Sequence, residues 1–299
     1  MPRPPAKPPQ RRPEPAPQPE SVDPMWLLKA GAATVAAAIV CGYLALCLLF
    51  YQGQWQLVLH PTRTSSAPAS IDGAPYQLLH FGPGDSGIPQ LVGWWIPSAT
   101  SARYANTTLL FLPPGDGSLA NSMPTLATLH NLGINVFAFD YRGYGQSATT
   151  HPNQQNMNQD AESAWTYLTA SRHIPANQII PYGTGAGASL AASLATSHSA
   201  IPALVLDSPY TDLLDAVQHD PRSSLLPTSL LFHEDFPLTT PLKTLHTPKL
   251  LLSKSASQPT AAYRTAADPK IAVEFTTPTE AVYTQTLTRF LDQYAPAAH

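Results

Sequence analysis

Hydrophobic positions along this chain follow two different patterns. An uninterrupted apolar run from Ala30 to Tyr51 carries no charged residue, and the chain beyond it alternates short apolar stretches with longer amphipathic ones. About 20 apolar residues, each rising about 1.5 Å along a helix, cross the hydrocarbon core of a bilayer. The run is too long for the apolar region of a signal peptide and ends without a small-residue cleavage site. We therefore predict a transmembrane helix over residues 25–51.

The residues before this helix are rich in proline and poor in apolar side chains. Such a segment has little to bury and its prolines keep it extended, so residues 1–24 are expected to form a disordered tail. Five basic residues precede or begin the helix, whereas only Arg63 follows it closely. The five are Arg3, Lys7, Arg11, Arg12 and Lys29. This asymmetry predicts a cytoplasmic N-terminus and an outward-facing body, which would be periplasmic in a bacterium.

The body, residues 52–299, carries few signals of a charged partner or a cofactor. The net charge of the chain is −3 and no basic patch stands out, which argues against a nucleic-acid partner. Both cysteines, Cys41 and Cys47, lie in the apolar run, so a cysteine-free body fits an oxidising compartment. His233-Glu234-Asp235 lacks the spacing of a metal motif, and we expect no metal or cofactor. The expected partners are the bilayer and proteins of a membrane complex.

Eight apolar runs in the body have the length and spacing of β-strands. They cover residues 76–81, 91–96, 107–112, 134–140, 178–182, 203–207, 249–252 and 270–275. Apolar residues at helical spacing mark 122–132, 159–171, 186–196 and 279–294. An antiparallel hairpin followed by alternating strands and helices predicts an α/β domain, with a mostly parallel eight-stranded sheet and helices on both faces. Residues 210–246, between the sixth and seventh strands, are expected to form a small cap.

The last helix has the clearest start signal. Thr277-Pro278-Thr279-Glu280 reads as a capping box with proline at the first helical position. Apolar residues from Tyr283 to Tyr294 then mark one helical face.

The junction between the fifth strand and its helix is the most informative part of the sequence. Gly183, Gly185 and Gly187 alternate there, in the Gly-x-nucleophile-x-Gly pattern of a nucleophile elbow. The middle residue is usually serine, but here it is Gly185. Glycine tolerates the strained backbone of this turn and has no side chain that attacks a substrate. The turn is therefore expected to be kept while its nucleophile is absent.

Four further segments, in chain order, resemble the α/β-hydrolase fold. They are Val92–Pro97, Asn135–Ser147, Leu204–Tyr210 and Thr247–Leu252. The strand and loop Asn135–Ser147 is the most specific of them. The resemblance covers about Gln54 to Tyr294. It is closest to membrane-anchored members that are similar to serine aminopeptidases and lipases.

The resemblance also implies where the residues of a catalytic triad would stand. The nucleophile position is Gly185, and the acid position after the seventh strand is Ser257. The histidine position before the last helix falls on Glu280 or Thr279. Asp207 after the sixth strand is an alternative acid position in this fold, but a structural role at the strand end is the simpler interpretation. All three triad residues are thus missing from their expected places.

The loop after the third strand is altered as well. In Pro113–Ser118, Pro114 has no N–H to donate, and Asp116 would bring negative charge towards a developing oxyanion. A cleft at this edge of the sheet would still offer backbone donors to a neutral ligand. Its expected lining residues are Gly115, Asp116, Gly117, Ala186, Asp207 and His151.

These observations support two hypotheses about function. The first is an inactive pseudohydrolase, anchored in a membrane, which works as a binding or scaffold module. The second is an active esterase-like or peptidase-like hydrolase with a displaced nucleophile, Ser189, Ser208 or Ser257, and a loop histidine. The second hypothesis requires one of these hydroxyls within hydrogen-bond reach of a histidine nitrogen. A purely structural role beside the membrane helix is a third possibility.

Overall fold

The computed structural model describes residues 23–64, 66–82, 87–210, 213–218, 223, 225–254, 261–278 and 280–295. The proline-rich tail before residue 23, Ser257 and Thr279 lie outside the described residues. Contacts within the chain form two compact units, Met1–Leu49 and Phe50–His299.

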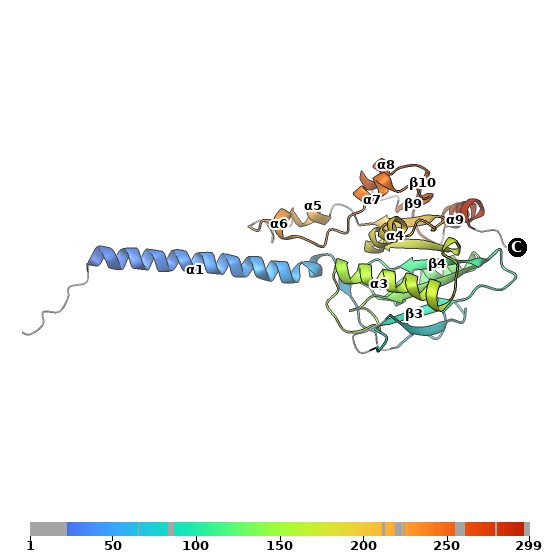
Figure 1. Cartoon of the computed structure of the whole chain (residues 1–299), viewed down its shortest axis with the longest axis horizontal. Coiled ribbons are helices and arrows are strands. Elements are labelled where there is room, and N and C mark those ends of the chain that lie inside the picture. Colours follow the sequence, from blue (N-terminus) through green and yellow to red (C-terminus); the bar gives the residue numbers. More distant parts are fainter. Residues whose placement is uncertain are drawn as a thin grey trace, which may run out of the picture. The chain divides into compact units, whose positions relative to one another are not determined.

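The first unit holds most of helix α1, Pro24–Gly53 (Figure 1). In the described part of the chain this is the one helix long and apolar enough to cross a membrane, with a mean hydropathy of 2.4 in its most apolar window. Length and composition of this kind fit a membrane anchor, and they also fit a signal sequence.

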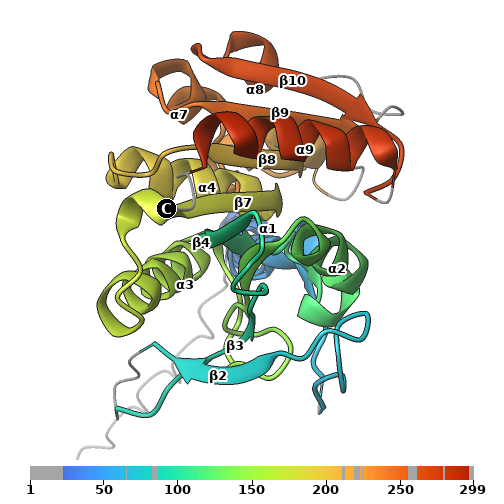
Figure 2. The same cartoon turned by 90° about the vertical axis from the view of Figure 1, so that its right-hand side faces the viewer.

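The second unit is built on an eight-stranded sheet with the order β10-β9-β8-β7-β4-β6-β3-β2 (Figure 2). The strands are β2 Gln77–Phe81, β3 Leu91–Ile96, β4 Tyr104–Leu112, β6 Ile134–Asp140, β7 Ile179–Gly185, β8 Leu204–Pro209, β9 Lys249–Lys254 and β10 Lys270–Phe275. Only β3 runs antiparallel to its neighbours. The sheet is therefore mostly parallel, as predicted, and each of the eight expected runs is one of its strands.

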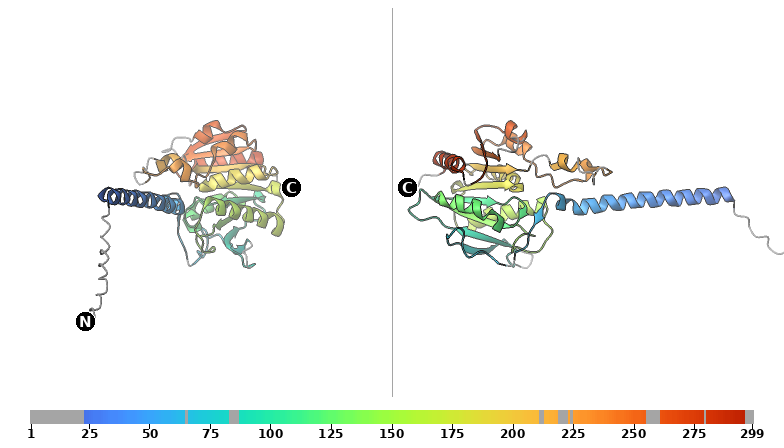
Figure 3. Two further views of the ribbon diagram at one scale, coloured as in Figure 1. Left: turned by 60° about the vertical axis from the view of Figure 1, so that its left-hand side comes forward. Right: turned by 180° about the vertical axis from the view of Figure 1, so that it is seen from behind.

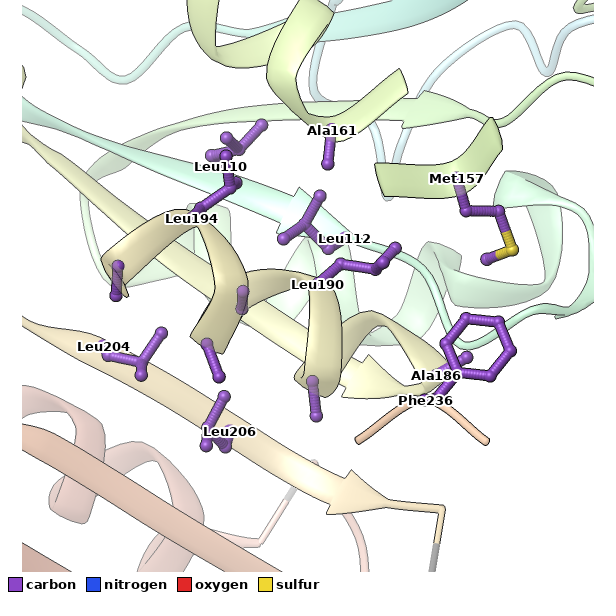
Figure 4. Packing of buried hydrophobic residues seen from close by; sticks show 14 of the residues in the cluster. Leu110, Leu112, Met157, Ala161, Ala186, Leu190, Leu194, Leu204, Leu206 and Phe236 are labelled. Atoms are coloured by element: carbon purple, nitrogen blue, oxygen red, sulfur yellow. The ribbon is translucent and has the colours of Figure 1, made fainter. Parts of the chain in front are cut away.

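Helices cover both faces of this sheet (Figure 2). The helices of this unit are α2 Met123–Asn131, α3 Gln154–Thr166, α4 Ala186–Ser197, α5 Leu213–Gln218, α6 Thr228–Leu231, α7 Thr239–Thr244, α8 Ala261–Thr265 and α9 Ala281–Tyr294. On one face, leucines of α4 pack against β4 and α3 (Figure 4). On the other, α2 and α9 cover Phe111 and Tyr182. The central strands are apolar throughout because both of their faces are buried.

Two helix starts differ from the prediction. Helix α3 begins at Gln154, five residues earlier than expected, because the Asn153 side chain caps it by accepting the Asn156 N–H at 2.8 Å. The expected capping box before α9 is wrong. Glu280 is the residue before the first helical turn, and its carboxylate accepts the Thr276 N–H at 3.1 Å instead.

Between β8 and β9 the chain forms short helices rather than sheet. Helices α5, α6 and α7 lie there, within the residues 210–246 expected to form a cap. Helices α5 and α6 follow β8 on the side of the sheet where that strand ends, and α7 leads back to the start of β9 (Figure 3). Phe232 and Phe236 from this segment are buried in the same core as α4, so the segment is packed on the body.

Asp140, at the end of β6, holds the loop that follows it. Its Oδ1 accepts the Leu119 N–H at 2.7 Å, and its backbone carbonyl accepts the Ser147 hydroxyl at 2.6 Å. A Cβ on Gly145 would lie 1.9 Å from Asp140 Oδ2, so the loop requires glycine there. Burial raises the pKa of Asp140 to about 6.

This raised pKa makes the stability of the fold depend on pH. A free aspartate titrates near pH 4, so Asp140 holds its proton more tightly when folded. The resulting stabilisation is complete below about pH 4 and is lost as the pH rises through about 6. At about 1.4 kcal/mol per pKa unit, its size is at most about 3 kcal/mol. We expect Asp140→Asn to flatten the fall in unfolding free energy across this interval, measured by chemical unfolding of the full chain in detergent.

The matched control is Asp72→Asn, at an exposed aspartate. This substitution should leave the pH profile unchanged. An equal slope in the Asp140→Asn variant and the native chain would contradict the role given to Asp140.

Candidate functional site

The junction of β7 and α4 has the backbone of a nucleophile elbow. Gly185 stands at its tip with φ 56° and ψ −123°, in a region that is strained for residues with a side chain. Its flanking glycines let the backbone segments touch. A Cβ on Gly183 would lie 2.2 Å from the Gly187 carbonyl oxygen, and one on Gly187 would lie 2.1 Å from the Leu112 carbonyl oxygen. The turn is therefore present, and its tip bears no side chain.

Pro114 fills the space beside the tip. A Cβ built on Gly185 would lie 2.7 Å from the Pro114 Cβ and 2.9 Å from its carbonyl oxygen. That carbonyl also accepts the N–H of Ala186 at 3.2 Å. In an elbow enzyme the N–H after the nucleophile stabilises the oxyanion. Here the same donor is bonded to the protein itself.

The segment that follows α1 covers this edge of the sheet. β1, His60–Pro61, pairs in parallel with β5, Asp116–Gly117, as a separate two-stranded ladder. Leu59 is 1% exposed, and a Cβ on Gly115 would lie 2.9 Å from its Cδ2. The Tyr144 hydroxyl donates to the Gly115 carbonyl at 2.8 Å. Gly115 and Ala186, two residues of the predicted cleft, thus lie close to Leu59, and Asp116 and Gly117 pair with the same segment.

One histidine, His60, reaches the site although no sequence motif indicates it. His60 Nδ1 lies 2.7 Å from Asp116 Oδ1, and the Tyr210 hydroxyl bonds the other oxygen of the same carboxylate. Both members of the His60–Asp116 pair are more than half exposed. A histidine oriented by a carboxylate corresponds to the base and the acid of a catalytic triad, without its nucleophile. Because 56 residues separate the two, no local motif links them.

Asp207 belongs to a buried cluster that points towards α9. Its Oδ2 accepts the Tyr182 hydroxyl at 2.5 Å and the Tyr283 hydroxyl at 3.4 Å, and its Oδ1 accepts the Ser208 hydroxyl at 2.8 Å. Tyr182 and Tyr283 both lie in the core under α2 and α9. Burial raises the pKa of Asp207. The Asp207 carboxylate therefore accepts hydrogen bonds from two tyrosines and a serine, and from no histidine among the described residues.

The remaining predicted site residues lie elsewhere. His151 is exposed and packs against Trp55, with ring centroids 5.3 Å apart, so it lines a different cavity from the elbow. Glu280 precedes α9 and bonds the Thr276 backbone. The described residues hold no cluster of three or more side chains suited to a metal ion.

The displaced-nucleophile hypothesis requires a serine beside a histidine. The Ser189 hydroxyl donates to the Pro237 carbonyl at 2.8 Å, and the Ser208 hydroxyl donates to Asp207. Neither hydroxyl is bonded to an imidazole, and Ser257 lies outside the described residues.

The strand order, the elbow and the loop after β6 define an α/β-hydrolase fold. Solved structures agree. An esterase of Pyrococcus furiosus superposes with a TM-score of 0.60 at 18% identity, over 80% of this chain and 98% of that chain. An α/β hydrolase from Vibrio vulnificus superposes with a TM-score of 0.54 at 21% identity, over 75% of this chain and 81% of that chain. At these identities the likeness shows the fold alone.

A family model described as serine aminopeptidase, S33, matches residues 110–297, which is more than half of the chain. The chain therefore belongs to this family of the α/β-hydrolase superfamily.

Curated relatives match part of the chain. An uncharacterised protein of Mycobacterium tuberculosis is 30% identical over 165 residues, 55% of this chain and 56% of the relative. The α/β hydrolase domain-containing protein WAV2 of Arabidopsis thaliana is 30% identical over 128 residues, 42% of this chain and 41% of the relative. The chain spans about half the length of the curated relatives it matches, or less.

The close contacts at the elbow predict the effect of two substitutions. Gly183→Ala and Gly187→Ala each force a methyl group into a carbonyl oxygen, so the strand and helix must move apart. Overpacking of this kind costs about 1–3 kcal/mol. For a body of this size, that lowers the melting temperature of the full chain by roughly 2–12 °C.

Gly53→Ala is the matched control, because a Cβ at Gly53 would meet no atom within 4 Å. Melting can be followed by near-ultraviolet circular dichroism in detergent. Equal melting temperatures for Gly183→Ala and Gly53→Ala would show that the elbow accommodates a methyl group at position 183, contrary to the close contact with Gly187.

Proposed function

We propose that this chain is a membrane-anchored α/β-hydrolase-like protein that lacks hydrolytic activity and works as a binding or scaffold module. One observation carries the proposal: the tip of the elbow is Gly185, and Pro114 occupies the space where a side chain would stand. The fold itself is kept around this point. A hydrolase fold that lacks its nucleophile can still bind a partner, but it cannot form an acyl-enzyme at the elbow.

Hydrolysis through an acyl-enzyme needs a nucleophile, a base and donors for the oxyanion. The first is missing at Gly185, and the main donor, the Ala186 N–H, is bonded to Pro114. The His60–Asp116 pair offers a base, but Asp116 also brings a negative charge next to the site of the oxyanion. Two of these requirements, the nucleophile and the free oxyanion donor, are thus unmet at the elbow.

The proposal includes the membrane as the first partner. Helix α1 would anchor the protein, and the basic residues that precede it favour a cytoplasmic N-terminus. The body would then face outward and meet other proteins of a membrane complex. A weakly charged surface and the absence of a basic patch make nucleic acid an unsuitable partner.

Fluorophosphonate labelling tests the missing activity, because the probe reacts with activated serines. We expect the full native chain in detergent to remain unlabelled, beside an active serine hydrolase as a positive control. Gly185→Ser should also remain unlabelled, since the new side chain would clash with Pro114 and would have no imidazole at positions 279–280. It should also melt several degrees lower, for the reason of strain at φ 56°.

Labelling of the native chain at Ser189, Ser208 or Ser257 would overturn the proposal and identify a displaced nucleophile. Hydrolysis of a p-nitrophenyl ester that disappears in His60→Gln would overturn it by another route, because it would make His60 a working base. If deletion of the gene causes a growth defect, we expect the His60→Gln variant to restore growth as fully as the native protein, because the proposed function needs no catalytic base.

A further inference from the structure

A second cavity lies apart from the elbow, in the unit Phe50–His299. Its volume is about 710 Å³, and three stretches of chain line it: the end of α1 with the following turn, the loop into α3 with its first turns, and the segment after α6. None of the residues around Gly185 belongs to it. The cavity is therefore independent of the proposed loss of catalysis.

The walls of this cavity are fixed by hydrogen bonds. The Gln54 side chain, 4% exposed, donates to the carbonyls of Tyr51 at 2.9 Å and Leu231 at 3.2 Å, and accepts the His233 N–H at 2.6 Å. Gln154 ties the opposite wall, because its Oε1 accepts the Phe236 N–H at 2.9 Å. A cavity with fixed walls needs little ordering when a ligand binds.

Anionic ligands are poorly matched to this cavity. Its described lining includes no lysine or arginine. The N-terminus of α3, which would attract an anion, is already occupied, since the Gln154 N–H donates to the Glu234 carboxylate at 2.6 Å. Arg142 reaches Gln159 Oε1 at 3.0 Å, but its charge is neutralised by Asp160 at 2.6 Å. A phosphate group would find the buried Glu234 carboxylate here and no lysine or arginine in the described lining.

Neutral hydroxyl groups fit the lining well. Trp55 and Tyr51 supply aromatic rings, each packed edge-on or tilted against a histidine at 5.3 Å. The side-chain amides of Gln52, Gln155 and Asn158 line the same space and carry both donors and acceptors. A sugar ring presents an apolar face to an aromatic ring and hydroxyls, which both donate and accept, to amides. This combination selects a polyhydroxyl group over a charged one.

The position of the cavity in the chain indicates where such a group would come from. Tyr51 ends the apolar run, and Gln52 and Trp55 follow within about 6 Å of helix rise. If α1 crosses the bilayer, these residues stand at the level of the lipid headgroups. We propose that this cavity binds the neutral sugar headgroup of a membrane glycolipid. The proposal rests on α1 as a membrane span, and it holds whether or not the elbow is catalytic.

Binding can be measured by native mass spectrometry on the full chain in detergent micelles. The probes are monoglucosyl- and monogalactosyldiacylglycerol, phosphatidylglycerol as an anionic lipid, and methyl glucoside as a free sugar. We expect saturable binding of a glycolipid, at least tenfold tighter than that of phosphatidylglycerol or methyl glucoside. Trp55→Ala, Gln52→Ala and Gln155→Ala should each weaken glycolipid binding about tenfold, the effect of losing one well-placed contact.

Gln56→Ala is the matched control, because Gln56 is exposed on the same turn and does not line the cavity. It should leave binding unchanged. Gln52 and Gln155 are exposed, so their variants keep the test sound if Trp55→Ala fails to fold. Three results would overturn the proposal: no saturable glycolipid binding, equal binding of phosphatidylglycerol, or equal binding of methyl glucoside, which would point to a soluble sugar.

Discussion

The hydrogen bond from the Ala186 N–H to the Pro114 carbonyl connects the start of α4 to the loop after β4. The bond can form only because Gly185 has no Cβ, since a Cβ would meet Pro114 at 2.7 Å. The glycine and the closed loop therefore support each other. A side chain at position 185 would clash with Pro114, and Gly185 without Pro114 beside it would leave a gap at the edge of the sheet.

The electrostatics of this edge follow from the same closure. Asp207 is buried with two tyrosines, and Asp116 is held at the surface by His60 and Tyr210. Asp207 forms no ion pair among the described residues, so the hydroxyls of two tyrosines and Ser208 supply its hydrogen bonds. Burial is the main cause that raises the pKa values of Tyr182 and Tyr283. Both hydroxyls therefore stay protonated and can donate hydrogen bonds. The hydrogen bonds of Asp207 therefore join β7, β8 and α9.

The fold could be predicted from the sequence because its central strands are continuous apolar runs. Each run was placed to within a few residues, since a strand buried on both faces leaves no room for polar side chains. Helix starts were less predictable. Asn153 begins α3 with a polar first turn that carries no periodic signal, and Glu280 bonds the loop instead of the helix.

The site was predictable only where it is local in the chain. Gly185 at the tip follows from three alternating glycines, but the filling of the cleft does not. Pro114, Leu59 and His60 meet the elbow through long-range contacts that no spacing reveals. His151 was expected at the elbow because its loop leaves the same edge of the sheet. Its ring instead packs on Trp55, a contact that depends on the path of the chain after α1.

The ladder of β1 and β5 has a mechanical consequence. It is only two residues long, and its strand β1 lies in the chain between α1 and the eight-stranded sheet. If α1 anchors the chain in a membrane, a tension applied through it would load the Gln54 bonds to Leu231 and His233 first and this short ladder next, well before the main sheet. Peeling β1 away would uncover Gly115 and the elbow while the rest of the body stayed folded. The covered edge would then open in response to force on α1.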